Sequence, residues 1–133
     1  MDKDYIKAAS IANDALSRIN SIYDNAKTGI FEDNKACKAM EEFISSIEDF
    51  VNTVEHYSKD TKEGYLELNK NGRYELKGTE LTCGYPVEIY NRKYGEWNDG
   101  RIEHSDEYGG YYFYNYDDRH MSLSDEVKAR IRY

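Results

Sequence analysis

The clearest structural signal in the sequence is the aromatic run Gly109-Gly110-Tyr111-Tyr112-Phe113-Tyr114-Asn115-Tyr116. Aromatic residues favour strands, and a Gly-Gly pair permits the positive φ angles of a tight turn. Alternate side chains of a strand lie on opposite faces, so Phe113 lies on one face while Tyr112 and Tyr114 lie on the other. Only one face can line a core. The other must meet the rest of the chain, a second copy or a partner.

Other segments with a two-residue period surround this run, from Gly64 to the end of the chain. They are Tyr65–Leu68, Arg73–Leu76, Val87–Tyr90, Trp97–His104 and Val127–Arg132. The first two are separated by an Asn-Gly pair, which is a strong signal for a hairpin turn. Five or six short strands in about 70 residues predict a small closed barrel, because closure removes the exposed strand edges.

The N-terminal half has a different period. In residues 1–60 the apolar residues recur at steps of three and four, which is helical spacing. Gly29 is suited to end one helix, and Asp33 or Asn34 is suited to cap the next. An alanine-rich row in the first helix would let large residues of the second, including Phe43 and Phe50, fill the groove between the helices.

Together these periods predict an α+β protein with two units. Residues 1–60 form an antiparallel helical hairpin, and residues 64–133 form a small SH3-like β-barrel, with polar residues 59–63 between them. Two helices cannot bury both of their faces. The hairpin must therefore pack on the barrel, on a target or on a second copy, and the last option makes the chain a homodimer.

The charge of the chain restricts its partners. Lys and Arg total 18 against 26 Asp and Glu, which gives a formal net charge of −8. Such a protein repels a phosphate backbone, so direct nucleic-acid binding is not expected. No apolar run is long enough for a membrane span, and Met1–Asp4 does not resemble a signal peptide, so we expect a cytoplasmic protein. Cys37 and Cys83 are expected to be buried, reduced thiols, with no metal or cofactor.

The C-terminal half resembles SH3-like or Tudor-like barrels, and in particular a small uncharacterised family of low-GC Gram-positive bacteria and their mobile elements. The resemblance covers about residues 64–132 and is most specific in Trp97–Ser105. It implies a fold and a genomic setting, since that family has no established chemistry. The Tudor-like likeness also suggests an aromatic cage for a methylated cation, for which Tyr90, Tyr94 and Trp97 are candidates.

The sequence contains no strong catalytic pattern. Glu103-His104-Ser105 would place His104 on the opposite strand face from its neighbours, so a relay cannot form locally. Cys83 could act as a nucleophile only if a base reached it through space. Nucleotide-binding, dinucleotide-binding and zinc-protease motifs are absent. We therefore expect a protein that is not an enzyme.

Acidic residues gather in the turns of the C-terminal half, beside the tyrosine strand. The candidate partner-binding residues are Glu103, Asp106, Glu107, Tyr112, Tyr114, Asp117 and Asp118. Clustered carboxylates can imitate a phosphate track and occupy the basic groove of a nucleic-acid enzyme. The mobile-element setting makes an anti-CRISPR-like inhibitor of a basic host nuclease, or of its nucleic-acid complex, the most concrete hypothesis. The alternative is an adaptor with a peptide-binding barrel and a dimerising hairpin.

Overall fold

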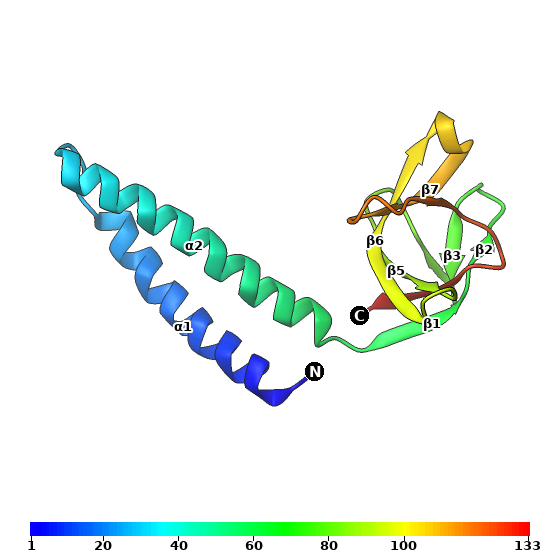
Figure 1. The fold of residues 1–133 in the computed structure, drawn as a ribbon, viewed down its shortest axis with the longest axis horizontal. Helices are drawn as coiled ribbons and strands as arrows, with labels where there is room; N and C mark the ends of the chain where they lie inside the picture. The colour runs from blue at the N-terminus through cyan, green and yellow to red at the C-terminus, as the bar shows by residue number, and fades with distance from the viewer. The chain divides into compact units, whose positions relative to one another are not determined.

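A computed structural model describes residues 1–133 and divides them into two compact units, Met1–Lys59 and Asp60–Tyr133. The first unit contains both α-helices and the second contains all of the strands (Figure 1). The predicted α+β class and the order of the two parts are confirmed. The sequence placed the start of the second unit at Gly64, whereas its first strand already begins at Thr61.

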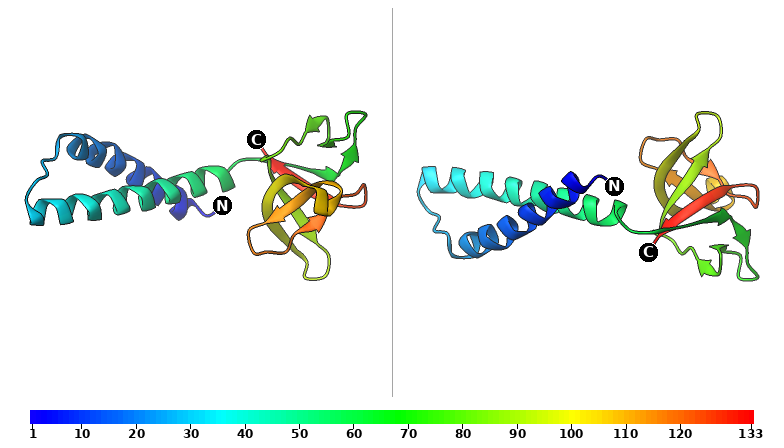
Figure 2. Two further views of the ribbon diagram at one scale, coloured as in Figure 1. Left: turned by 90° about the horizontal axis from the view of Figure 1, so that it is seen from above. Right: turned by 90° about the horizontal axis from the view of Figure 1, so that it is seen from below.

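The helical unit consists of α1 (Lys3–Asn25) and α2 (Phe31–Tyr57), which run antiparallel beside each other (Figures 1 and 2). Their most regular series of buried and half-buried residues is Ala9, Ala12, Leu16, Ile19 and Tyr23 in α1, and Cys37, Met40, Ile44, Ile47, Val51 and Val54 in α2. The prediction that Phe43 and Phe50 fill the groove is wrong, because both side chains are exposed. Neither helix combines the length and the apolar composition that crossing a membrane requires.

The loop between the helices differs from the prediction. The first helix ends at Asn25, so Gly29 lies in the loop and not at the helix terminus. The second helix begins at Phe31, before both predicted caps. Asn34 has another role, because its side-chain oxygen accepts a hydrogen bond from the N–H of Gly29 at 2.9 Å and thereby fixes the loop.

The β unit contains two antiparallel sheets. The larger has the strand order β1-β9-β5-β6-β7-β8, and the smaller has the order β2-β3-β4. Their bounds are β1 Thr61–Tyr65, β2 Glu67–Leu68, β3 Tyr74–Leu76, β4 Thr79–Glu80, β5 Pro86–Asn91, β6 Glu96–Ser105, β7 Gly110–Asn115, β8 Met121–Ser122 and β9 Lys128–Arg132. A short 3-10 helix, η1 (Asp106–Tyr108), connects β6 to β7.

The larger sheet curves strongly (Figure 2) but does not close. Its edge strands, β1 and β8, pair only with β9 and β7 respectively. The predicted closed barrel is therefore wrong: the sheet is open. The physical reason lies in β8, which has only two residues. Its free edge is too short for the other edge strand, β1, to pair with it and close the sheet.

Both sheets share one hydrophobic core. Its buried residues are Leu66, Leu76, Leu81, Val87, Ile89, Ile102, Phe113, Leu123, Val127, Ala129 and Ile131. The first three come from the chain around the small sheet, which thus packs against the inner face of the larger one. The alternation predicted for β7 is confirmed, because Phe113 is buried in this core and Tyr111 packs against it, while Tyr112 and Tyr114 lie on the other face. Tyr116 follows the end of the strand and contacts the ring of Tyr114.

The place of β1 predicts how the β unit can be isolated. A fragment that starts at Asp60 should fold cooperatively, because it keeps all five residue pairs between β1 and β9 and the hydrogen bond from the N–H of Tyr133 to the carbonyl of Asp60. A fragment that starts at Gly64 loses most of β1 and exposes the edge of β9, so it should be less stable. Urea unfolding followed by circular dichroism compares the two fragments, and equal midpoints would contradict this role of β1.

Candidate binding face

The face of the larger sheet that points away from the core is unusually rich in aromatic and charged side chains. We call it the outer face. The register of the strands and the alternation of side chains place on it Glu88, Tyr90, Trp97, Asp99, Arg101, Glu103, Tyr112, Tyr114, Lys128, Arg130 and Arg132. Among the sequence-predicted site residues, Glu103, Tyr112 and Tyr114 are therefore brought together here.

The tyrosines of β7 are held by stacking neighbours. The ring of Tyr112 stacks on Tyr108 with centroids 4.2 Å apart, and that of Tyr114 stacks on His120 at 4.4 Å. On its other side Tyr114 meets the guanidinium of Arg101, 4.2 Å from the ring centroid. Rings fixed in this way lose little conformational entropy when they bind, which favours a contact surface. Burial and the nearby Glu103 carboxylate raise the pKa of Tyr112, so its hydroxyl stays protonated at neutral pH.

Glu103 is engaged within the chain. One carboxylate oxygen accepts a hydrogen bond from Nε of Arg101 at 2.6 Å, and the other accepts one from the thiol of Cys83 at 3.2 Å. The bond from Arg101, followed by that from Cys83, lowers the pKa of Glu103. The Glu103 carboxyl is thus ionised, but its negative charge is largely paired with Arg101. Glu103 therefore resembles a phosphate less than the sequence suggested.

The other predicted carboxylates lie at the two ends of β7. Asp106 and Glu107 belong to η1, just before the strand, while Asp117 and Asp118 form the turn after it, and all four are exposed. A six-residue strand spans roughly 20 Å. The tyrosines therefore lie between two acidic turns, one at each end of the strand.

The second of these turns is fixed by the buried side chain of Asn115. Its Oδ1 accepts hydrogen bonds from the N–H groups of Asp117 and Arg119 at 3.0 and 3.1 Å, and its Nδ2 donates to the carbonyl of Asp99 at 2.8 Å. The N–H of Asn115 also donates to Nδ1 of His120 at 3.0 Å. The acidic turn is consequently ordered before any partner binds.

The proposed cage for a methylated cation is not assembled. Trp97 lies on the outer face and not in the core, with Tyr90 edge-on at 5.1 Å. The guanidinium of Arg130 lies 4.3 Å from the Trp97 centroid, and Lys128 lies 5.1 Å from that of Tyr90. Tyr94 instead meets Arg119 and Lys93. The ring faces that a ligand cation would use are thus occupied by cations of the chain itself.

The residues considered for catalysis are not arranged as a catalytic site. His104 packs edge-on against Tyr111 at 4.9 Å, and the hydroxyl of Ser105 accepts a hydrogen bond from the N–H of Glu107. Cys83 is exposed, which corrects the expectation that it is buried. Its hydrogen bond to Glu103 raises the pKa of the thiol, and this is the opposite of the activation that a nucleophilic cysteine requires. No three His, Cys, Asp or Glu residues are placed to hold a metal ion.

Sequence reasoning missed three residues that contact the tyrosines of β7: Arg101, Tyr108 and His120. Arg101 could not be found by counting along the strands. A two-residue turn at Gly109-Gly110 would place Ser105 opposite Tyr114, whereas the real connection includes η1 and places Arg101 there. Tyr108 and His120 contact the tyrosines from a 3-10 helix and a turn. Contacts made from such segments leave no periodic pattern in the sequence by which they could be predicted.

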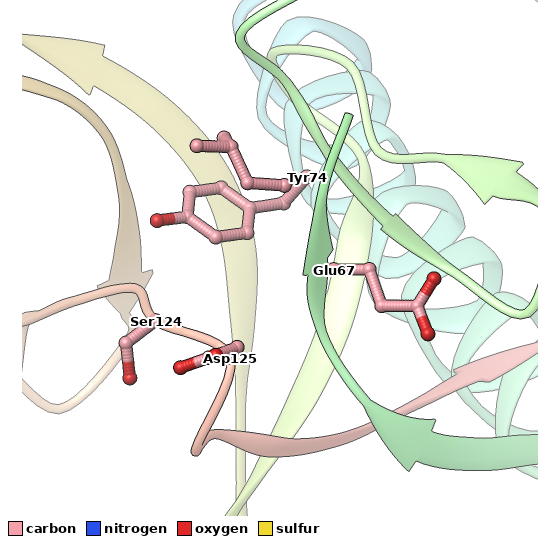
Figure 3. Close-up of a pocket in the computed structure, with 5 residues that line it drawn as sticks. Glu67, Tyr74, Ser124 and Asp125 are labelled. Atoms are coloured by element: carbon pink, nitrogen blue, oxygen red, sulfur yellow. The ribbon is translucent and has the colours of Figure 1, made fainter. Parts of the chain in front are cut away.

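A shallow pocket lies away from this face, between the small sheet and the loop before β9. It is lined by Glu67, Leu68, Tyr74, Ser124 and Asp125, which come from segments far apart in the sequence (Figure 3). The hydroxyl of Tyr74 donates to the carbonyl of Leu123 at 3.0 Å and fixes the ring in the wall of the pocket. Leu68 is 62% exposed beside it, so the pocket has an apolar rim and two carboxylates.

Comparison with known proteins gives a family but no function. No curated protein and no solved structure matches the chain. A family model described as a domain of unknown function, DUF5348, matches residues 64–131, which is the β unit from the fourth residue of β1 to the fourth residue of β9. Because this match covers half of the sequence, the chain belongs to the DUF5348 family.

Proposed function

We propose that the β unit is a non-enzymatic binding module that holds a basic protein surface across β7. The observation that carries the proposal is the row of stacked tyrosines, Tyr112 and Tyr114, between two exposed acidic turns. Tyrosine is enriched in protein interfaces because its ring buries apolar area while its hydroxyl remains hydrogen-bonded. Lysine and arginine side chains of a partner would meet the carboxylates at both ends of the strand.

The carboxylates and the tyrosines of this region would act at different stages of binding: the carboxylates during association and the tyrosines once the complex has formed. Glu103 is paired with Arg101, so the long-range field comes mainly from Asp106, Glu107, Asp117 and Asp118. Exposed charges of this kind accelerate the encounter with an oppositely charged partner, and their effect decreases with salt. The tyrosines contribute after contact, by excluding water from the interface.

The most concrete version of this function is an inhibitor encoded by a mobile element. In that version the acidic turns occupy the basic groove in which a host nucleic-acid enzyme holds its substrate, as an anti-CRISPR protein does. Support comes from the net charge of −8 and from the resemblance of Trp97–Ser105 to mobile-element proteins. The partner would be a basic nuclease or its nucleic-acid complex, and the protein itself would bind no nucleic acid directly.

The proposal can be tested by measuring binding kinetics. The partner is first recovered by crosslinking from a lysate of a low-GC Gram-positive bacterium and then used in the kinetic measurements. In one variant Asp106, Glu107, Asp117 and Asp118 are replaced by Asn or Gln. This variant should associate at least tenfold more slowly at low salt, and its rate should depend less on salt. A control variant that neutralises Asp24, Glu42, Glu48 and Asp49 of the helical unit removes the same net charge and should keep the wild-type association rate.

Tyr114→Ala should behave differently. Loss of a central aromatic contact costs about 2 kcal/mol, which corresponds to roughly thirtyfold faster dissociation with an unchanged salt dependence. Unchanged rates and salt dependence in the charge variant would reject the phosphate-mimic function. Unchanged dissociation of Tyr114→Ala would show that the partner does not contact β7.

The second candidate is an adaptor that binds a peptide in the pocket between the small sheet and the loop before β9. The observation in its favour is the exposed Leu68 beside the fixed ring of Tyr74, with Glu67 and Asp125 at the rim. Leu68→Ala should then weaken binding at least tenfold, while Tyr114→Ala leaves it unchanged.

A further inference from the structure

The helical hairpin has a heptad pattern that extends beyond its own packing. If the heptad positions are written abcdefg, the regular buried series described above occupies positions a and d of both helices, with Ala9 and Cys37 at a. Two helices that pack only against each other need no more than this a/d seam. A further continuous apolar row is therefore not explained by the packing of the two helices against each other, and such a row is typical of an interaction surface.

Such a row exists at the g positions, and most of its residues are exposed, while Ala15 and Tyr57 are half-buried. Phe43 is 54% exposed and Ile22 is 63% exposed. The row consists of Ala8, Ala15 and Ile22 in α1, and Ala36, Phe43, Phe50 and Tyr57 in α2. In an antiparallel pair the g positions of the two helices flank the same side of the seam, so the two rows form one continuous surface. We call it the g side.

The opposite side of the hairpin is mostly polar. Its e positions carry Asn13 and Asn20 in α1 and Asn34, Glu41, Glu48 and Glu55 in α2, and Ile6 near the start of α1 is the one apolar residue among them. The c positions beyond the g row are weakly charged, with Asp4, Arg18 and Glu32 as their only charged residues. An apolar face three positions wide, next to a side with few charges, is the pattern of a helix in a four-helix bundle.

The sizes of the g residues identify the occupant. The row of α1 has small side chains at Ala8 and Ala15, while that of α2 has large ones at Phe43 and Phe50. Both pairs are seven residues apart, which is about 10.5 Å along a helix. Next to Ala15 the surface of α1 has a shallow, mainly apolar depression, lined by Ile11, Asp14, Ala15, Arg18 and Ile19. The g side thus has large side chains on α2 and small side chains on α1 with the same repeat, and a depression next to one of the small ones.

We propose that a second copy of this chain covers the g side, so that two hairpins form an antiparallel four-helix bundle. The α1 helix of each copy faces α2 of the other, and Phe43 and Phe50 pack beside the partner's alanine row. The reverse pairing, α1 on α1 and α2 on α2, would place alanine against alanine and phenylalanine against phenylalanine, leaving a void in one layer and crowding in the other. The proposal does not depend on the function of the β unit.

Sedimentation velocity of the full chain across micromolar concentrations tests the proposal. The wild type should have twice the mass of the chain, and Phe50→Glu should have the mass of a single chain, because a buried charge without a partner prevents association. Asn52→Glu is the matched control: it adds the same charge two residues away on the exposed b position and should remain dimeric. A wild type with the mass of one chain at every concentration, or a dimeric Phe50→Glu, would overturn the proposal.

Ala15→Phe tests the arrangement of the helices. If α2 of the second copy faces Ala15, the larger ring collides with Phe43 or Phe50 and weakens the dimer at least tenfold. If α1 faces α1, the same substitution fills a void and strengthens the dimer. A strengthened dimer would therefore reject the proposed pairing. Circular dichroism of each variant above the dissociation constant checks that the helices are retained.

Discussion

Replacement of Gly100 by alanine is expected to unfold the β unit or to destabilise it by more than about 3 kcal/mol. Gly100 lies in the middle of β6, paired with Val87 of β5 on one side and Asn115 of β7 on the other. A Cβ at this position would overlap the carbonyl oxygen of Tyr114. It would also lie 2.7 and 2.9 Å from the Cε1 and Cζ atoms of Phe113.

Neither neighbour can move away at low cost. The Tyr114 carbonyl is part of the backbone of β7, which is held between β6 and β8, and Phe113 is 1% exposed within the core. Overpacking a core usually costs about 1 to 3 kcal/mol, and a collision with backbone belongs at or above the upper end of that range. The absence of a side chain at Gly100 is what lets β6 run unbroken through the curved part of the sheet.

Gly64→Ala is the matched control for this prediction. Gly64 is also a strand glycine without a positive φ angle, but its added Cβ would meet chiefly the flexible side chain of Lys77, at 3.1 Å. It should therefore cost less than about 1 kcal/mol. Guanidinium unfolding monitored by tyrosine and tryptophan fluorescence compares the two variants. A Gly100→Ala protein as stable as the Gly64→Ala protein would show that the sheet can relax around the clash.

The strands of this protein were predictable where alternation or aromatic composition was clear in the sequence. Val87–Tyr90 was recognised by its alternation and Tyr111–Tyr116 by its aromatic residues, and β5 and β7 both lie inside the larger sheet, away from its edges. The edge strand β1 was missed, because residues 61–64, Thr-Lys-Glu-Gly, carry polar side chains that are typical of a linker. Polar composition is common at sheet edges, where it discourages association.

The helices show a second limit of sequence periodicity. The rows at a/d and at d/g both recur at steps of three and four, and both contain large apolar residues. The pattern therefore predicted a hairpin correctly but could not decide which row the hairpin uses for itself. The structure assigns Ile44 and Val54 to the internal packing and leaves Phe43 and Phe50 exposed.

The pairing of strands that lie far apart in the sequence explains why some contacts of the outer face could not be predicted. Glu88 alternates with Val87 and Ile89 as a polar strand residue does, and such residues usually lie on a solvent-exposed face. Glu88 is 7% exposed, because Arg130 and Arg132 extend over it from β9, 42 and 44 residues later in the chain. The register of β5 with β9 brings these residues together, and no local pattern specifies that register.

Removal of the Glu88 carboxylate should give the second large effect. Its oxygens accept hydrogen bonds from Nη2 of Arg130 at 2.8 Å and from Nε of Arg132 at 2.7 Å. Glu88→Gln keeps the shape of the side chain but removes the Glu88 charge from beside two largely covered guanidinium groups. Breaking a buried ion pair in this way costs about 3 to 5 kcal/mol. We expect about 3 kcal/mol, measured by urea unfolding, because both arginines retain some contact with water.

The loss of stability in Glu88→Gln should be specific to this buried network and should not follow from the removal of an exposed ion pair. Glu63 pairs with Lys128 on the same sheet at 3.2 Å, but both side chains are substantially exposed. Glu63→Gln is therefore the matched control and should change the free energy of unfolding by less than about 1 kcal/mol. Equal effects of the two substitutions would show that burial does not strengthen the Glu88 network.

The pH dependence of the loss provides a sharper test. Burial opposes ionisation of Glu88, but the hydrogen bonds and charges of Arg132 and Arg130 outweigh it and lower the pKa of Glu88 below its ordinary value of 4.5. A carboxyl whose pKa is lower in the folded state stabilises the protein fully above its unfolded pKa. It loses this contribution as the pH falls below 4.5 and through the folded pKa. The stability difference between the wild type and Glu88→Gln should thus be constant from pH 8 to about pH 6 and should shrink towards pH 3. A difference that stays the same at pH 3 would mean that the ionised carboxylate is not what holds the two arginines in place.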